Sequence, residues 1–111
     1  MKLTTYTEFH GEISISDIGK RLREIVKTTK TSFKILTGYG STSNISKSKQ
    51  AAIKSLTKMK SEGLIKGFLP GEVKTQLLKQ DDYFYDDKLK YGSSIKTDAD
   101  YGNDGIIFVF V

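Results

Sequence analysis

The stretch Ile106-Ile107-Phe108-Val109-Phe110-Val111 decides the fold class, because it is a run of six consecutive apolar residues. Strands with one solvated face alternate between apolar and polar residues. A run without alternation is instead typical of a strand that is buried on both faces. The stretch therefore predicts a strand in the middle of a sheet.

The sequence before this run contains two apolar stripes at helical spacing. Ile18, Leu22 and Ile25 form the first stripe, after a capping-box-like start at Ser14 and before an expected end near residues 28–30. The second helix is expected at about residues 47–61, where Gly63 offers a left-handed stop and the stripe consists of Ala52, Leu56 and Met59. Strands are expected at residues 3–9, 33–37 and 64–69.

Residues 70–105 carry weaker signals, with a short helix at 72–79 and a short strand at 83–85 as the candidates. We treat residues 71–104 as a long variable loop. The order strand–helix–strand–helix–strand–variable–strand predicts an α/β (α+β sandwich) fold. Its simplest form is a four-stranded mixed sheet with two main helices, either on one face or split across both.

The composition indicates one globular domain over residues 1–111, with 37% hydrophobic and 28% charged residues. The chain has no cysteine, which excludes a disulfide framework and a thiolate metal site. Its start, Met1-Lys2-Leu3-Thr4-Thr5, lacks the apolar region of a secretory signal, and no apolar run approaches the ~20 residues of a membrane span. We expect a cytoplasmic monomer without a membrane partner.

The positive charge is concentrated in the middle of the chain. Residues 20–66 hold twelve Lys or Arg against Glu24 and Glu62, a net charge of +10, whereas residues 1–19 carry −2 and residues 67–111 carry −3. A block this basic is the electrostatic footprint expected for a phosphate backbone. The alternative is the solvated surface of two lysine-rich helices.

A glycine-punctuated turn, Thr37-Gly38-Tyr39-Gly40-Ser41, follows the second expected strand and precedes the basic helix. Its glycines let backbone N–H groups approach a phosphate, and the positive end of the helix faces the same anion. Lys47 and Lys49 add charge. Tyr39 either stacks on a base or folds over the helix. If the first two strands are parallel, His10 lies at the same sheet edge, where ligands bind in α/β sheets.

These residues together resemble the small MutS-related (Smr) domain over nearly the whole chain. The matching motifs are Phe9-His10-Gly11, Thr37-Gly38-Tyr39-Gly40-Ser41 and Asp104-Gly105 before the last strand. The family's first motif is Leu-Asp-x-His-Gly, so Thr7 replaces the leucine and Glu8 the aspartate; Thr37 stands where many members have histidine. The resemblance implies a sandwich similar to the C-terminal domain of translation initiation factor three.

The resemblance also implies binding to RNA or structured DNA, in some members as an endonuclease and in some on ribosomes. It places Glu8 and His10 in the histidine motif and Thr37, Gly38 and Gly40 in the turn. His10 would act as a general base, with Glu8 two residues earlier on the same strand face to orient it. The alternative for His10 is a structural hydrogen bond that closes the turn.

Departures from the family pattern bear on catalysis more than on binding. The extra methylene of Glu8 moves the carboxylate by roughly 1.5 Å. The single histidine excludes a two-histidine RNase mechanism. A single-base mechanism, one assisted by a divalent cation such as Mg²⁺, and binding alone stay open, and no dedicated metal site is expected.

Two further function classes stay open. One is a non-catalytic nucleic-acid- or ribosome-binding adaptor that uses the acidic stretch at residues 81–87, which we otherwise expect to be a solvated loop. The other is a small nucleotide-binding enzyme, although no Gly-Lys-Ser/Thr follows the glycine turn.

Overall fold

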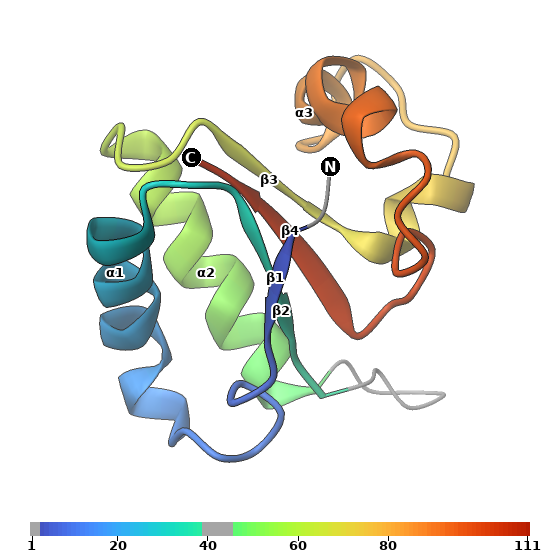
Figure 1. Cartoon of the computed structure of the whole chain (residues 1–111). Coiled ribbons are helices and arrows are strands. Elements are labelled where there is room, and N and C mark those ends of the chain that lie inside the picture. Colours follow the sequence, from blue (N-terminus) through green and yellow to red (C-terminus); the bar gives the residue numbers. More distant parts are fainter. Residues whose placement is uncertain (1–2, 39–45) are drawn as a thin grey trace.

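The structure is a computed structural model that describes residues 3–38 and 46–111. Within these ranges the protein has an α/β fold, a four-stranded mixed sheet with three α-helices (Figure 1). The strands are β1 (Thr4–Tyr6), β2 (Phe33–Leu36), β3 (Gly67–Pro70) and β4 (Ile106–Phe110). The helices are α1 (Ile18–Thr29), α2 (Lys47–Ser61) and α3 (Tyr85–Tyr91), with 3-10 turns η1 (Ile15–Asp17), η2 (Gly71–Thr75) and η3 (Gly92–Ile95).

The central position predicted for the last strand is confirmed. The sheet order is β1-β2-β4-β3, and β4 is antiparallel to both of its neighbours. Alternate residues of β4 enter two separate apolar clusters: Ile107 and Val109 on one face, and Ile106, Phe108 and Phe110 on the other. The apolar run lacks alternation because both faces of this strand are covered.

α1 and α2 lie side by side on one face of the sheet (Figure 1). Both predicted stripes are buried there, together with the sheet residues that they cover. The two helices approach closely at Gly19, where an added Cβ would lie 2.8 Å from Ser55 Oγ. The small residue therefore sets how near α1 can come to α2.

The predicted bounds of α2 are confirmed because both ends carry local stop signals. Ser46 Oγ accepts the N–H of Lys49 at 3.0 Å and caps the first turn. After the last turn, Gly63 has a φ of +78°, and the N–H of Leu64 reaches back to Met59 O at 3.0 Å. This is a Schellman stop, which needs a left-handed residue at the glycine position.

The other strands and α1 begin and end slightly differently from the prediction. β1 ends at Tyr6, well before residue 9, and β3 begins at Gly67 instead of residue 64. The capping box expected at Ser14 is wrong: the Ser14 hydroxyl donates to the side chain of Asp17 at 2.8 Å and caps no backbone N–H, and a 3-10 turn, η1, precedes α1. The predicted end of α1 is confirmed at Thr29, with Lys30 in the left-handed region.

The segment 71–105 is a second layer and not the variable loop that the sequence indicated. It contains η2, α3 and η3 and covers the opposite face of the sheet (Figure 1). The strand expected at residues 83–85 is wrong, since α3 begins at Tyr85 and the Phe84 ring packs edge-on against Phe68 at 5.2 Å. The helix expected at residues 72–79 is only the short η2 turn.

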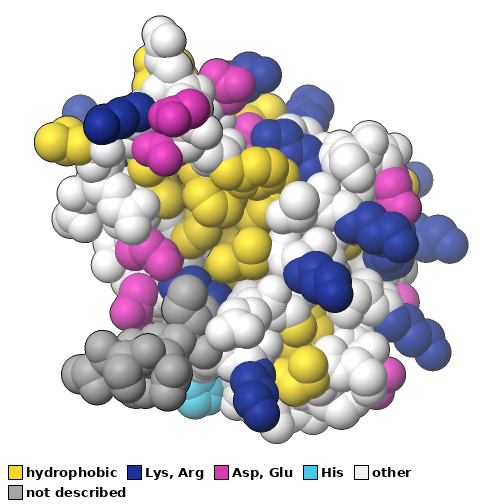
Figure 2. Space-filling model, turned by 180° about the vertical axis from the view of Figure 1, so that it is seen from behind, with side chains coloured by type: hydrophobic (Ala, Val, Ile, Leu, Met, Phe, Trp, Pro, Cys, Tyr) yellow, Lys and Arg dark blue, Asp and Glu magenta, His cyan; other side chains and the backbone are white. Residues whose placement is uncertain are grey.

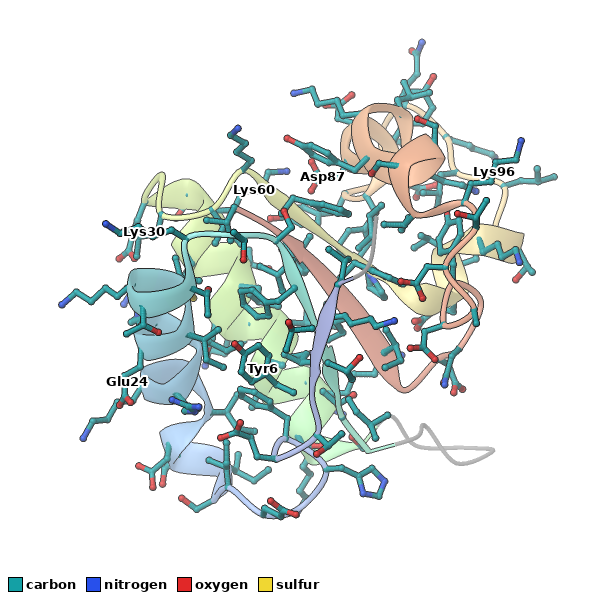
Figure 3. The ribbon with its side chains drawn as sticks, viewed as in Figure 1. Tyr6, Glu24, Lys30, Lys60, Asp87 and Lys96 are labelled. Carbon is teal, nitrogen blue, oxygen red and sulfur yellow. The ribbon has the colours of Figure 1, made fainter. Side chains whose placement is uncertain are left out.

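Three lysines, from β2 and α2, form ion pairs with acidic residues of this layer. The Lys34 ammonium lies 2.8 Å from Asp98 and 2.7 Å from Asp100, and Lys49 pairs with Glu72. Figure 3 shows the third lysine, Lys60, reaching toward Asp87 of α3.

Asp87 corrects the expectation that the acidic stretch is a solvated loop. Its carboxylate is buried, accepts from Lys60 Nζ at 3.1 Å and accepts the backbone N–H of Phe68 at 3.2 Å. The stretch therefore contributes one buried carboxylate that is held by the sheet and α2, while Asp81, Asp82 and Asp86 stay exposed.

None of the helices that the structure describes is long and apolar enough to cross a membrane.

Candidate nucleic-acid interface

The end of β2 is fixed by Thr37 and Gly38. Thr37 is fully buried, and both its backbone N–H and its hydroxyl donate to Gly105 O, at 2.7 and 3.1 Å. Gly38 donates its N–H to Ser48 Oγ at 3.0 Å, and an added Cβ would lie 2.9 Å from Ser46 Oγ. Thr37 thus joins β2 to the start of β4, and Gly38 lets the chain pass close to the start of α2.

The remaining residues of the predicted turn, Tyr39, Gly40 and Ser41, lie outside the described residues. The described part still bears on the phosphate-binding hypothesis. Because the N–H of Gly38 already donates to Ser48, it is not a donor for a phosphate in this conformation. Binding at this turn therefore depends on other groups.

Glu8 and His10 do not lie on one strand face, which corrects the expectation from the sequence. They lie in a turn after β1, where the N–H of His10 donates to Thr7 O and the N–H of Glu12 donates to Glu8 O, both at 3.1 Å. The hydrogen bonds of this turn replace strand pairing after Tyr6. The side-chain alternation that would align Glu8 with His10 is therefore lost.

The carboxylate of Glu8 is held by Arg21 of α1. Arg21 Nε lies 2.8 Å from Glu8 Oε2, and a second guanidinium nitrogen lies 3.4 Å from Oε1. The hydrogen bond to Glu8 raises the pKa of the Arg21 guanidinium. In this arrangement Glu8 fastens the turn to α1, and His10 is exposed.

Both sequence motifs leave the sheet at the same edge. β1 and β2 are parallel, as the hypothesis required, and Tyr6 lies opposite Ile35 in the register. The turn that carries His10 therefore follows β1 on the side where Thr37 and Gly38 follow β2 (Figure 1). The start of α2 joins them there through the Gly38–Ser48 hydrogen bond.

Lys47 and Lys49 lie in the first turn of α2 but differ in exposure. Lys47 is exposed, whereas Lys49 is buried, pairs with Glu72 and donates to Asp104 O at 2.8 Å. Lys49 therefore presents no solvated charge to a phosphate, which corrects the expectation. Its spacing was the available signal, because Lys49, Ala52 and Leu56 follow one another at intervals of three and four residues on the buried side of α2.

The structure redistributes the charge of the central block. Within residues 3–38 and 46–111, five of its twelve cations form ion pairs, and four of these five pair with acids from outside the block. The other seven are exposed and have no ion-pair partner in the described part of the chain: Lys20, Lys27, Lys30, Lys47, Lys54, Lys58 and Lys66.

α2 carries the most regular group of these seven lysines. Lys47, Lys54 and Lys58 are spaced by seven and four residues, which places them on one stripe, opposite the buried stripe. We call these three residues the α2 lysine stripe. The helix contains no acidic residue that could neutralise it. In Figure 2, Lys and Arg side chains (dark blue) stand out on the side of the molecule that α1 and α2 form.

Sequence reasoning singled out Lys47 but not Lys54 and Lys58, although their spacing to Lys47 was visible.

Among the described residues, no group of three His, Asp or Glu side chains is placed to hold a metal ion. No family model, no curated protein and no solved structure matches this chain. The resemblance to the Smr domain therefore stays a prediction.

Proposed function

We propose that the protein binds the phosphate backbone of a nucleic acid through the α2 lysine stripe, as an Smr-like domain. The observation that carries the proposal is that these three lysines are exposed, aligned and unopposed by any acid on their own helix. A lysine is a flexible point charge without the planar fork of arginine. The stripe would therefore bind phosphates without reading the base sequence.

The stripe is long enough to span several phosphates of a nucleic acid. From Lys47 to Lys58 the axis of α2 rises by about 17 Å. Duplex DNA carries about ten phosphates over that length, counting both strands. Three lysines can thus reach separate phosphates without a change in the protein.

The position of Lys47 at the start of α2 gives further support. Lys47 lies in the first turn and no acid does, so a positive charge faces the positive end of the helix dipole. This placement is unfavourable in the free protein. A bound phosphate would relieve it, because the anion is attracted by both Lys47 and the helix end.

The proposal is tested by measuring how salt affects binding to labelled single-stranded RNA, duplex DNA and branched DNA. The variant Lys54→Gln/Lys58→Gln should bind more weakly, and the slope of log K against log salt should fall by about 2, one for each lost phosphate contact. The control is Lys79→Gln/Lys90→Gln, which removes equal charge from exposed sites in the segment 71–105. Equal weakening by both variants would contradict the site assignment.

Cleavage is a second candidate function, favoured by the exposed His10 at the sheet edge that α2 also reaches. His10 would act as general base toward a 2′-hydroxyl or a water molecule, with or without Mg²⁺. His10→Ala should then abolish cleavage while the circular dichroism spectrum is unchanged. Retained cleavage would exclude His10 as the base. Binding without any cleavage would instead favour a non-catalytic adaptor for nucleic acid or the ribosome.

A further inference from the structure

An open groove of about 470 Å³ runs along the outer side of the segment 71–105. One wall is the extended chain that follows η2 and includes Leu77 and Leu78. The other wall is one side of α3 and of the η3 turn, with Leu89 as its exposed leucine. Tyr101 also lines the groove and is itself buried.

The groove has exposed leucines on both walls. Leu77 is 98% exposed and Leu89 is 67% exposed, and these are the two most exposed large apolar side chains of the described residues. Single exposed apolar residues are common on protein surfaces and need no explanation. Leu77 and Leu89 are different, because both line one groove from separate segments of the chain, so a single ligand could cover both and remove apolar surface from water.

The charged residues of the groove are of one sign. Among the described residues that line it, two are lysines, Lys88 and Lys96, and none is acidic. Lys88 Nζ donates to Gln76 O at 2.7 Å, which fastens the two walls together without neutralising its charge. Lys96 is exposed and forms no ion pair in the described part of the chain; Figure 3 shows it on the side away from α1 and α2.

We propose that this groove binds a short acidic, amphipathic peptide segment of another protein. An apolar side chain of the peptide would enter between Leu77 and Leu89, and its Asp or Glu residues would face Lys88 and Lys96. Helix-in-groove binding of this kind combines apolar anchors with complementary charges at the rim. The apolar residues of the peptide thus match the leucines of the groove, and its acidic residues match the lysines.

Two other occupants fit the groove less well. A nucleic acid would satisfy the lysines, but its phosphates would leave the leucines without an apolar partner. A second copy of this chain, related by a two-fold axis through the groove, would bring the same lysines toward one another. The groove and the α2 lysine stripe lie on opposite layers of the sheet, so a peptide and a nucleic acid could be bound together.

The test is a titration of the ¹⁵N-labelled protein with a peptide of about 15 residues that has leucine and glutamate at helical spacing, long enough to form a helix. We expect amide shifts in residues 76–78 and 85–96 and none along α2. Two matched peptides serve as controls, one with lysine for each glutamate and one with serine for each leucine. Equal binding by either control peptide would overturn the proposal.

Variants of the protein make the site assignment falsifiable. Leu77→Ser and Leu89→Ser should each weaken peptide binding about tenfold, because each removes part of the buried apolar contact. Leu64→Ser changes another exposed leucine, beyond α2, and should leave the affinity unchanged. A loss with Leu64→Ser equal to that with Leu77→Ser would overturn the assignment. A dimer in sedimentation that Leu77→Ser converts to monomer would instead show that a second copy occupies the groove.

Discussion

The two faces of the sheet are covered by layers that are held in different ways. α1 and α2 bury aligned apolar stripes, and local signals such as Ser46 and Gly63 define the ends of α2. The segment 71–105 has a smaller apolar cluster and is fastened by three lysines that pair with its carboxylates. The first layer is therefore apparent from local periodicity, whereas the second depends on partners far apart in the sequence.

This difference has a physical consequence for stability. Apolar burial responds little to pH or salt, but a buried ion pair depends on both charges being present. Lys34 and Asp98 are both about nine-tenths buried, so neither can be rehydrated easily if its partner is lost. Substitutions in the two layers should therefore produce distinguishable effects.

The largest effect is expected from Lys34→Met, which leaves Asp98 and Asp100 without their cation. Removing one partner of a buried ion pair typically lowers the free energy of unfolding by about 3–5 kcal/mol. Urea denaturation followed by circular dichroism measures this change, since the protein has no tryptophan. Arg23→Met is the control: the Arg23–Glu62 pair is 38% and 39% exposed, and its loss should cost less than about 1 kcal/mol. Similar losses for the two variants would contradict a special role for Lys34.

A somewhat smaller loss, about 3 kcal/mol, is expected from Leu56→Ala in the buried stripe of α2. The loss should be the same at neutral pH and below the ordinary carboxyl pKa near ~3.9, because no charge is involved, whereas the effect of Lys34→Met should shrink in that acid range as its carboxylate partners are protonated. Leu64→Ala removes a half-exposed leucine and should change the stability by less than about 0.5 kcal/mol. A pH-dependent effect of Leu56→Ala would show that the two layers are not held independently.

A smaller effect on stability is expected when pH, and not a substitution, removes one of the charges of the Lys34 ion pairs. Burial opposes the charged forms, but hydrogen bonds between Lys34 and the two carboxylates lower the pKa of Asp98 and raise the pKa of Lys34. A lowered carboxyl pKa contributes stability above the ordinary value near ~3.9, which is lost as pH falls through the lowered pKa. The raised pKa of the Lys34 ammonium contributes stability that is fully present below the ordinary value of about 10.4. This stability is lost as pH rises through the raised pKa of the folded protein. Hydrogen exchange should show residues 71–105 opening before α1 and α2 at acid pH. Asp98→Asn should loosen this segment already at neutral pH, so that its exchange changes less between neutral and acid pH.

The smallest effect has the opposite sign. Lys47→Gln removes a positive charge from the positive end of α2 and should raise the free energy of unfolding by about 0.5 kcal/mol. The same variant should weaken nucleic-acid binding if Lys47 contacts a phosphate. Thermal denaturation and binding assays on one preparation would test both parts. A variant that is neither more stable nor weaker in binding would remove Lys47 from the proposed interface.

Particular residues explain which predictions from the sequence succeeded. The position of β4 was predictable because a strand covered on both faces needs apolar residues at every position. The bounds of α2 were predictable because its cap and its stop are local. Lys34 and Asp98, in contrast, lie 64 residues apart, and no periodic pattern connects them. The layer that they join was therefore mistaken for a loop.

The candidate site was predictable only in outline. The parallel pairing of β1 and β2 brings the two motifs to one edge, as expected. The roles of single side chains differed because tertiary partners captured them: Arg21 holds Glu8, and Glu72 holds Lys49. A charge count along the sequence cannot separate such paired cations from exposed ones. The α2 lysine stripe became apparent once the paired cations were set aside.

Asp87 has a further consequence for how the sheet ends. β3 is an edge strand, and the N–H of Phe68 that points away from β4 is already donated to Asp87. Pro70, two residues later, has its nitrogen on the same side and carries no hydrogen. A strand from another molecule would therefore find neither donor available and would have to displace a buried carboxylate. Asp87 and Pro70 together hinder the pairing of a further strand with β3, and so hinder sheet extension and fibril-like aggregation.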